Sequence, residues 1–211
     1  MKKLLFILLN LLIINTLSAQ NRFGGGVILG FNAAQMDGDR AAGYNKVGLN
    51  TGLRGTVRLN EDGKWLLSTE LLFSQRGARS VERDYFIRNW KATLNYIEIP
   101  VMVSYLDWLQ EDRQYYKVHV MAGLSYGRLF SSKITESFTH PTEAVNLFQQ
   151  NDISYTGGVS YFISRNWGFT ARYSRSLNYL FHPKNYKNDP VLGGLTALQG
   201  YFLTFQTCFV F

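Results

Sequence analysis

The feature that most limits how this chain can fold is a two-residue alternation of apolar and polar side chains, repeated in long runs. In the clearest run, one parity holds Ile97, Ile99, Val101, Val103 and Tyr105, and the other holds Tyr96, Glu98, Pro100, Met102 and Ser104. Successive side chains of a β-strand point to opposite faces of a sheet. The pattern therefore predicts strands that have one apolar face and one face that is polar or small.

About eight such runs, each about 10 to 16 residues long, fill the chain after its first twenty residues. We expect strands at residues 23–34, 46–59, 64–79, 90–106, 114–130, 153–163, 166–176 and 198–211. A soluble antiparallel sandwich would show the same alternation, but its strands usually have about 3–10 residues. A membrane-crossing strand needs about 9–11 residues plus its extensions into the loops. Run length therefore favours an all-β fold, an eight-stranded antiparallel transmembrane β-barrel.

The connections between these runs alternate in length. Those at 60–63, 107–113 and 164–165 are short, and the first contains the Asp62-Gly63 hairpin signal. The connections at 35–45, 80–89, 131–152 and 177–197 are longer and more polar, and residues 141–150 could form a short helix. Outer-membrane barrels have short periplasmic turns and longer extracellular loops. We therefore expect the short turns and both termini on the periplasmic side.

The N-terminus has the pattern of a secretory signal peptide. A start of Met1-Lys2-Lys3 precedes an almost unbroken apolar run, which ends at Ser18-Ala19. The run is about 14 residues long, too short for a spanning helix of about 20 residues. We predict cleavage after Ala19, which leaves residues 20–211 as the outer-membrane barrel domain. A retained N-terminal anchor helix is the alternative.

Composition limits the classes of function. Removing Lys2 and Lys3 lowers the formal charge from +7 to +5, which suits an anionic lipid surface. The basic residues are scattered rather than clustered, which argues against a nucleic-acid partner. Cys208 is the only cysteine, so no internal disulfide can form.

Aromatic residues make up 15% of the chain and gather near the expected strand ends. Tyr and Trp have an apolar body and a polar tip, so they settle at the level of the lipid headgroups. We predict two aromatic girdles. The periplasmic girdle contains Trp65, Tyr105, Trp108 and Trp167, and the outer girdle contains Tyr126, Tyr155, Tyr173 and Tyr201. The alternative for any one of them is an ordinary core aromatic.

Charged residues fall on the parity that would face the barrel interior. They are Arg54, Arg58, Glu70, Glu98, Lys117, His119 and Arg172. The interior of an eight-stranded barrel is just wide enough to be filled by side chains, and charges inside a membrane wall are costly unless they are paired. We predict a lumen charge network in which Glu70 and Glu98 are the central acceptors. It could be a polar plug, a selective path for small solutes or a catalytic site.

Evidence for catalysis or metal binding is weak. His119 is a lone inward histidine, and the chain has no Gly-x-Ser-x-Gly motif of a serine nucleophile. No spacing of His, Cys or carboxylate residues matches a metal-ligand set, and no cofactor is expected. The sequence therefore favours a protein that is not an enzyme, with a barrel-embedded lipid-modifying enzyme as the less favoured reading.

The fourth run reads Leu94-Asn95-Tyr96-Ile97-Glu98-Ile99-Pro100-Val101 and is followed by alternating apolar residues. With the signal peptide, a Gly-rich first strand, and the segments 122–127 and 157–159, it resembles the PorT-like outer-membrane β-barrel family of Bacteroidetes-type bacteria. The resemblance covers essentially the whole mature chain and implies an eight-stranded porin-like barrel. The namesake of that family is associated with protein secretion and gliding. The final Phe211 resembles the C-terminal aromatic residue that barrel-assembly machinery reads.

We therefore expect a bacterial outer-membrane barrel whose extracellular loops carry a structural or surface-binding role. Two alternatives remain open: a narrow porin for ions or small solutes, and a barrel subunit of a secretion or gliding complex. The expected partners are outer-membrane lipids and lipopolysaccharide, the barrel-assembly machinery through Phe211, and envelope or secretion-complex proteins.

Overall fold

The structure is a computed structural model that describes residues 22–38, 43–80, 90–136, 142–143, 147–186 and 196–211. The predicted signal peptide, residues 1–19, lies outside these ranges. The strands are β1 (Phe23–Asp37), β2 (Lys46–Arg58), β3 (Trp65–Arg79), β4 (Trp90–Gln110), β5 (Tyr115–Glu136), β6 (Thr142–Glu143), β7 (Asn151–Phe162), β8 (Trp167–Ser176) and β9 (Gln199–Val210). Two short 3₁₀ helices are also formed, η1 (Glu111–Arg113) and η2 (Pro183–Tyr186).

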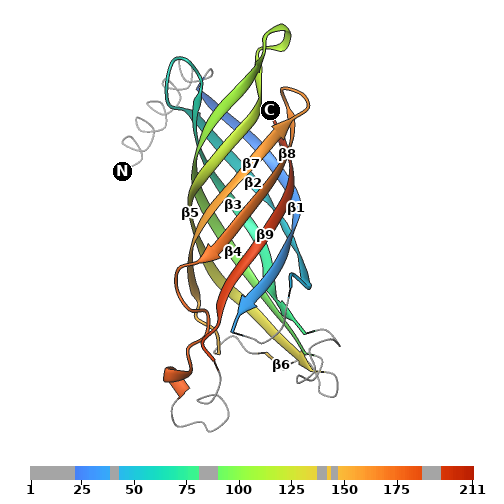
Figure 1. The fold of residues 1–211 in the computed structure, drawn as a ribbon, viewed down its shortest axis with the longest axis vertical. Coiled ribbons are helices and arrows are strands. Elements are labelled where there is room, and N and C mark those ends of the chain that lie inside the picture. The colour runs from blue at the N-terminus through green and yellow to red at the C-terminus, as the bar shows by residue number, and fades with distance from the viewer. Residues whose placement is uncertain (1–21, 39–42, 81–89, 137–141, 144–146, 187–195) are drawn as a thin grey trace, which may run out of the picture.

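The strands form one closed antiparallel barrel, as the sequence predicted. They pair in the order β4-β3-β2-β1-β9-β8-β7-β5, and β4 also pairs with β5, which closes the cylinder. Strand β6 adds only two residues to the edge of β5. Figure 1 shows the tilted strands, with the C-terminus at the same end as the short turns after β4 and β7. We call this end the short-turn end and the opposite one the long-loop end.

The apolar parity of each strand faces outward. On β4, Ile97, Ile99 and Val101 are 42 to 48% exposed, whereas Tyr96 and Met102 on the other parity are fully buried. In a soluble sandwich those Ile and Val side chains would be the buried ones. Large exposed apolar surfaces are rare on soluble proteins. The alternation therefore belongs to a barrel that presents its apolar face to lipid.

Local sequence explains the turns and one interruption in the ladder. Gly63 has a φ of +66° and closes the turn between β2 and β3 at the predicted Asp-Gly pair. Between β3 and β4, Thr69 pairs with Val101 and Leu72 pairs with Glu98, but Ile99 and Pro100 have no β3 partner. Because Pro lacks an amide hydrogen, it removes a ladder bond without shifting the register.

Two local expectations were wrong. Residues 107–113 were expected to form a turn, but β4 continues to Gln110 and the reversal is confined to η1 and Gln114. The suggested short helix at 141–150 also fails where it can be checked, because Thr142 and Glu143 pair with β5 as strand β6. Among the described residues, no helix is long and apolar enough to cross a membrane.

Candidate functional site

Three ionised side chains meet near the middle of the lumen, and we call them the Glu70 cluster: Arg54, Glu70 and Arg172. Arg54 of β2 donates from Nε to Glu70 Oε1 at 2.7 Å, and its Nη2 lies 2.6 Å from the same oxygen. Arg172 of β8 donates from Nη1 and Nη2 to the two Glu70 oxygens at 2.7 and 2.6 Å. Since β8 lies four strands away from β3 in the barrel order, this bidentate pair crosses the lumen.

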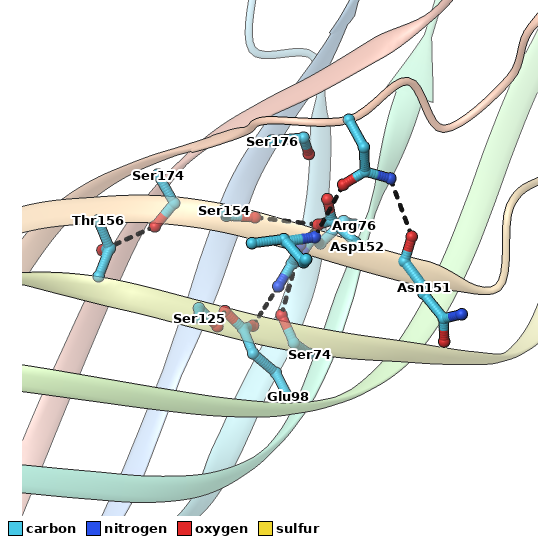
Figure 2. A network of polar contacts seen from close by, with 12 residues as sticks. Ser74, Arg76, Glu98, Ser125, Asn151, Asp152, Ser154, Thr156, Ser174 and Ser176 are labelled. Carbon is cyan, nitrogen blue, oxygen red and sulfur yellow. Dashed lines mark hydrogen bonds and ion pairs between the residues drawn. The ribbon is translucent and has the colours of Figure 1, made fainter.

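A second group lies nearer the long-loop end, and we call it the Arg76 cluster: Arg76, Glu98 and Asp152. Arg76 forms ion pairs with Glu98 of β4 and, at 2.6 Å, with Asp152 Oδ2 of β7. Ser125 donates to Glu98 at 2.6 Å, and Ser154 donates to Asp152 at 3.0 Å. Figure 2 shows these side chains converging on Arg76 from β3, β4, β5 and β7.

Aromatic faces hold the Arg76 guanidinium between them. Its central carbon lies 4.0 Å from the ring centroid of Phe202 and 4.9 Å from that of Tyr96. Gly127, on the neighbouring strand, leaves the necessary space, because a Cβ there would lie 3.2 Å from the Tyr96 ring. Guanidinium groups stack on aromatic rings and bind carboxylates with a fixed planar geometry. Aromatic rings therefore contact the face of the Arg76 guanidinium group, and carboxylates bind its edge.

Amide and hydroxyl side chains connect the space between the two clusters. Asn32 donates to Ser74 at 3.0 Å and accepts from Asn50 and Thr204 at 3.3 and 2.8 Å. Gln206 donates to Asn50 at 2.6 Å. These residues come from β3, β2, β1 and β9, four consecutive strands of the barrel, so the chain of hydrogen bonds follows the inner wall. Buried polar groups that are hydrogen-bonded in this way can be accommodated in a membrane-embedded interior.

The two clusters together balance their charge. The Glu70 cluster contains two guanidinium groups and one carboxylate, and the Arg76 cluster contains one guanidinium group and two carboxylates. Glu98 and Arg172, one from each cluster, line the same cavity of about 10 Å³. Arg172 Nε and Gln206 Oε1 have no protein partner there, and the cavity is large enough for about one water. The lumen at this level is filled by side chains with room for little else.

An apolar layer covers the Arg76 cluster at the long-loop end. Its buried members are Met36, Ala78, Ala92, Leu94, Tyr96, Leu129, Phe148, Leu180 and Phe181. A backbone hydrogen bond from Gln149 N to Leu180 O at 2.7 Å joins the two connecting segments that contribute to it, and one from Leu180 N to Leu198 O at 2.8 Å ties the start of the second segment to its end. The interior is therefore closed by an apolar layer over an ionic one.

The structure brings some of the predicted lumen residues together and leaves others apart. Arg54, Glu70 and Arg172 lie in one cluster, whereas Glu98 belongs to the other. His119 stacks on Phe162, with ring centroids 4.4 Å apart. The remaining two lie near the short-turn end: Arg58 is exposed at the end of β2, and the Lys117 ammonium lies 5.1 Å from the Trp108 ring. Among the described contacts, Arg58, Lys117 and His119 belong to neither cluster, and one network that includes all seven residues remains a prediction.

Sequence reasoning missed Arg76 and Asp152. Arg76 lies six residues after Glu70 on the same strand, so its parity already pointed inward. Asp152 was assigned to a loop because the strand was expected to begin at Ile153, whereas β7 begins two residues earlier, at Asn151. The alternation of inward and outward side chains could have identified both residues as facing the lumen.

The predicted girdle residues lie on the outer surface. Near the short-turn end, Trp65 packs against Tyr105 with centroids 5.3 Å apart, and Trp108 lies 6.3 Å from Tyr161. Trp167 packs there against Phe209 at 5.7 Å. Towards the long-loop end, Tyr155 lies 6.3 Å from Tyr173, and Tyr201 lies 5.4 Å from Tyr44. Tyr126 donates its hydroxyl hydrogen to Asn151 Oδ1 at 2.8 Å.

Metal chemistry has no support in this site. No group of three or more His, Cys, Asp or Glu side chains in the described ranges is arranged to hold a metal ion. Both carboxylates of the Arg76 cluster face Arg76, and the Glu70 carboxylate faces two guanidinium groups. The charged groups of both clusters are therefore engaged with one another.

Comparison with known proteins agrees with this architecture. A family model described as outer membrane protein beta-barrel domain matches residues 18–182. The attachment invasion locus protein Ail of Yersinia pestis superimposes with a TM-score of 0.50 at 12% identity, over 90% of this chain and 99% of Ail. Neisserial surface protein A gives a TM-score of 0.42 at 12% identity, over 89% of this chain and 96% of that protein. Among curated protein sequences, none matches the chain well enough to count as a relative.

Proposed function

Since this chain belongs to the outer membrane protein beta-barrel domain family, and is a small barrel of the bacterial outer membrane, we propose that it has a structural or surface-binding role. In this proposal the barrel is a rigid support, and the connections at its long-loop end face the exterior and carry the binding. The predicted export by residues 1–19 and the resemblance to PorT-like barrels are parts of the same proposal.

One observation carries the proposal: two successive layers of side chains fill the lumen. The Arg76 cluster crosses the interior, and the apolar layer that includes Phe148, Leu180 and Phe181 covers it. An open porin needs a water-filled path, and an eight-stranded barrel has little room for one. The filled lumen therefore argues for a support rather than a channel, and the ion-paired carboxylates argue against an enzyme.

The C-terminus supports the proposed partnership with barrel-assembly machinery. Phe211 is 74% exposed, and its backbone nitrogen donates to Gly25 O at 3.0 Å. Its ring lies against Gly25, where a Cβ would approach within 2.8 Å. An aromatic residue held at the outer edge of the seam between β1 and β9 can be read by an assembly partner. Secretion-complex proteins and outer-membrane lipids complete the expected partners.

Planar-bilayer conductance tests the proposal against the porin alternative. The purified full-length protein should insert and pass almost no current. Arg76→Ala, which removes the side chain linking β3, β4 and β7, should increase current bursts relative to the wild type. Arg175→Ala, at an exposed ion pair outside the lumen, is the matched control and should remain silent. Steady single-channel currents from the wild-type protein would contradict the proposal.

A further inference from the structure

The outer surface of the barrel becomes partly polar near the long-loop end. On the face formed by β4, β5 and β7, Ile97, Tyr126 and Ile153 are 42 to 48% exposed. The next outward residues towards the loops include Asn95 and Ser131, which lie opposite each other. The exposed Phe130 also lies in this zone, so polar and aromatic residues mix at this edge of the apolar band, as they do where lipid headgroups meet a barrel.

Arg128 lies at this edge and is held in place by neutral groups. Its Nη1 donates to Asn151 Oδ1 and its Nη2 donates to Gln150 Oε1, each at 2.6 Å. The same Asn151 oxygen accepts the Tyr126 hydroxyl hydrogen at 2.8 Å. Figure 2 shows Asn151 beside Asp152 at the start of β7, directed away from the Arg76 cluster. The alternation of β7 thus places one residue in the lumen network and its neighbour at the outer surface.

These contacts leave the Arg128 guanidinium oriented but not neutralised. Two of its five N–H donors bind amide oxygens, which remove none of its charge. Its side chain is exposed, and the exposed Phe130 ring lies beyond it on the same strand. The remaining donors can accept a bidentate anion, and a guanidinium matches the geometry of a phosphate.

Arg175 provides the comparison within the same molecule. It too lies at the long-loop end, directly across from two girdle tyrosines, Tyr155 and Tyr201. Its Nη2, however, forms an ion pair with Asp37 at 3.1 Å and also donates to Gln199. Among the contacts of the described residues, Arg175 has a carboxylate partner where Arg128 has only amides. The two arginines both lie towards the long-loop end but differ in charge compensation.

We propose that Arg128, oriented by Asn151 and Gln150, forms a binding site for the phosphate group of an outer-leaflet lipid A. This site deepens the proposed function, because it rests on the long-loop end facing the exterior. It names one residue through which lipopolysaccharide is recognised, on the barrel wall rather than on the loops. Phe130, on the loop side of Arg128, would contact the sugar, and Tyr126, on the membrane side, would contact the start of the acyl chains.

Native mass spectrometry of the full-length protein in mixed micelles tests the site. Diphosphoryl lipid A is titrated against wild type, Arg128→Gln, Arg128→Lys and the matched control Arg175→Gln. Loss of charge-assisted hydrogen bonds should weaken binding to Arg128→Gln by about tenfold or more. Arg128→Lys should retain part of the affinity, and Arg175→Gln should bind as the wild type does.

Two further probes identify the source of the phosphate. Dephosphorylated lipid A and phosphatidylglycerol should each bind the wild type about tenfold more weakly than diphosphoryl lipid A. Inorganic phosphate at matched concentration should not displace the lipid. Equal binding of lipid A to wild type and Arg128→Gln would overturn the proposal, as would equal binding of the dephosphorylated lipid or full displacement by phosphate. Because bilayer conductance is measured separately, failure here is distinguishable from failure of the proposed support role.

Discussion

The Glu70 carboxylate is the group whose loss should destabilise the barrel most. Four contacts of 2.6–2.7 Å join it to Arg54 and Arg172, and its side chain is fully buried. Glu70→Gln keeps the shape but leaves two guanidinium charges facing an amide. Breaking a buried ion pair by removing one partner costs about 3–5 kcal/mol. We expect the free energy of unfolding to fall by about 4 kcal/mol.

A matched substitution distinguishes the loss of a buried ion pair from the removal of a carboxylate in general. Asp37→Asn also removes a carboxylate from an arginine, Arg175, but their side chains are 59 and 37% exposed. Exposed pairs contribute about 0–1 kcal/mol. Asp37→Asn should therefore leave the unfolding midpoint nearly unchanged.

Urea unfolding in lipid vesicles, followed by tryptophan fluorescence and heat-modifiable gel mobility, measures both variants. A triple variant, Arg54→Met, Glu70→Leu and Arg172→Met, replaces the cluster with apolar side chains of similar length. It should recover much of the lost stability, because no charge of the Glu70 cluster is left without a partner, although the Arg76 cluster keeps one more carboxylate than guanidinium group. A Glu70→Gln protein as stable as Asp37→Asn would refute the reasoning, and so would a triple variant no more stable than Glu70→Gln.

Three further predictions follow from packing and surface contacts. Gly158→Ala should reduce the folded fraction in a gel-shift assay, because its methyl group would overlap the Ala171 carbonyl oxygen and crowd Arg172, whereas Gly157→Ala, on the open outer face, should fold normally. Trp65→Ala should reduce the tryptophan quenching by lipids brominated near the headgroup, because Trp108 and Trp167 remain in that girdle, and should unfold about 1 kcal/mol more easily through loss of its aromatic contact. Phe211→Ala should lower the amount of folded protein in outer-membrane fractions without changing the in vitro unfolding midpoint, and an unchanged amount would remove Phe211 from the assembly signal.

The architecture could be predicted because a strand has only one side-chain period. A period of two leaves two choices of inward face, and the apolar residues Ile97 and Val101 decided between them. Loop lengths then predicted which strand ends lie on the same side of the barrel, since short and long connections alternate. The ends of the strands were harder to predict from the sequence. Strand β4, for example, continues through Trp108, whose φ of +58° turns its ring to the outer surface.

The arrangement of side chains in the lumen could be predicted only in part from the sequence. Parity predicts that Glu70 and Arg172 point inward, but their meeting across the barrel depends on the tilt and stagger of the strands. Those quantities depend on every register in the sheet, which a local pattern does not contain. The division into two clusters, and the assignment of Glu98 to Arg76 rather than to Arg54, therefore required the three-dimensional structure.

Oxygen accessibility of spin labels along β4 tests the central claim most directly. Single cysteines are placed at each position from 96 to 103 in a Cys208→Ser background, and the labelled protein is studied in lipid bilayers. The account predicts a two-residue period, with maxima at Ile97, Ile99, Val101 and Val103 and minima between them. Maxima at Tyr96, Glu98 and Met102, or uniformly low accessibility at all positions, would contradict a closed barrel with its apolar face in lipid.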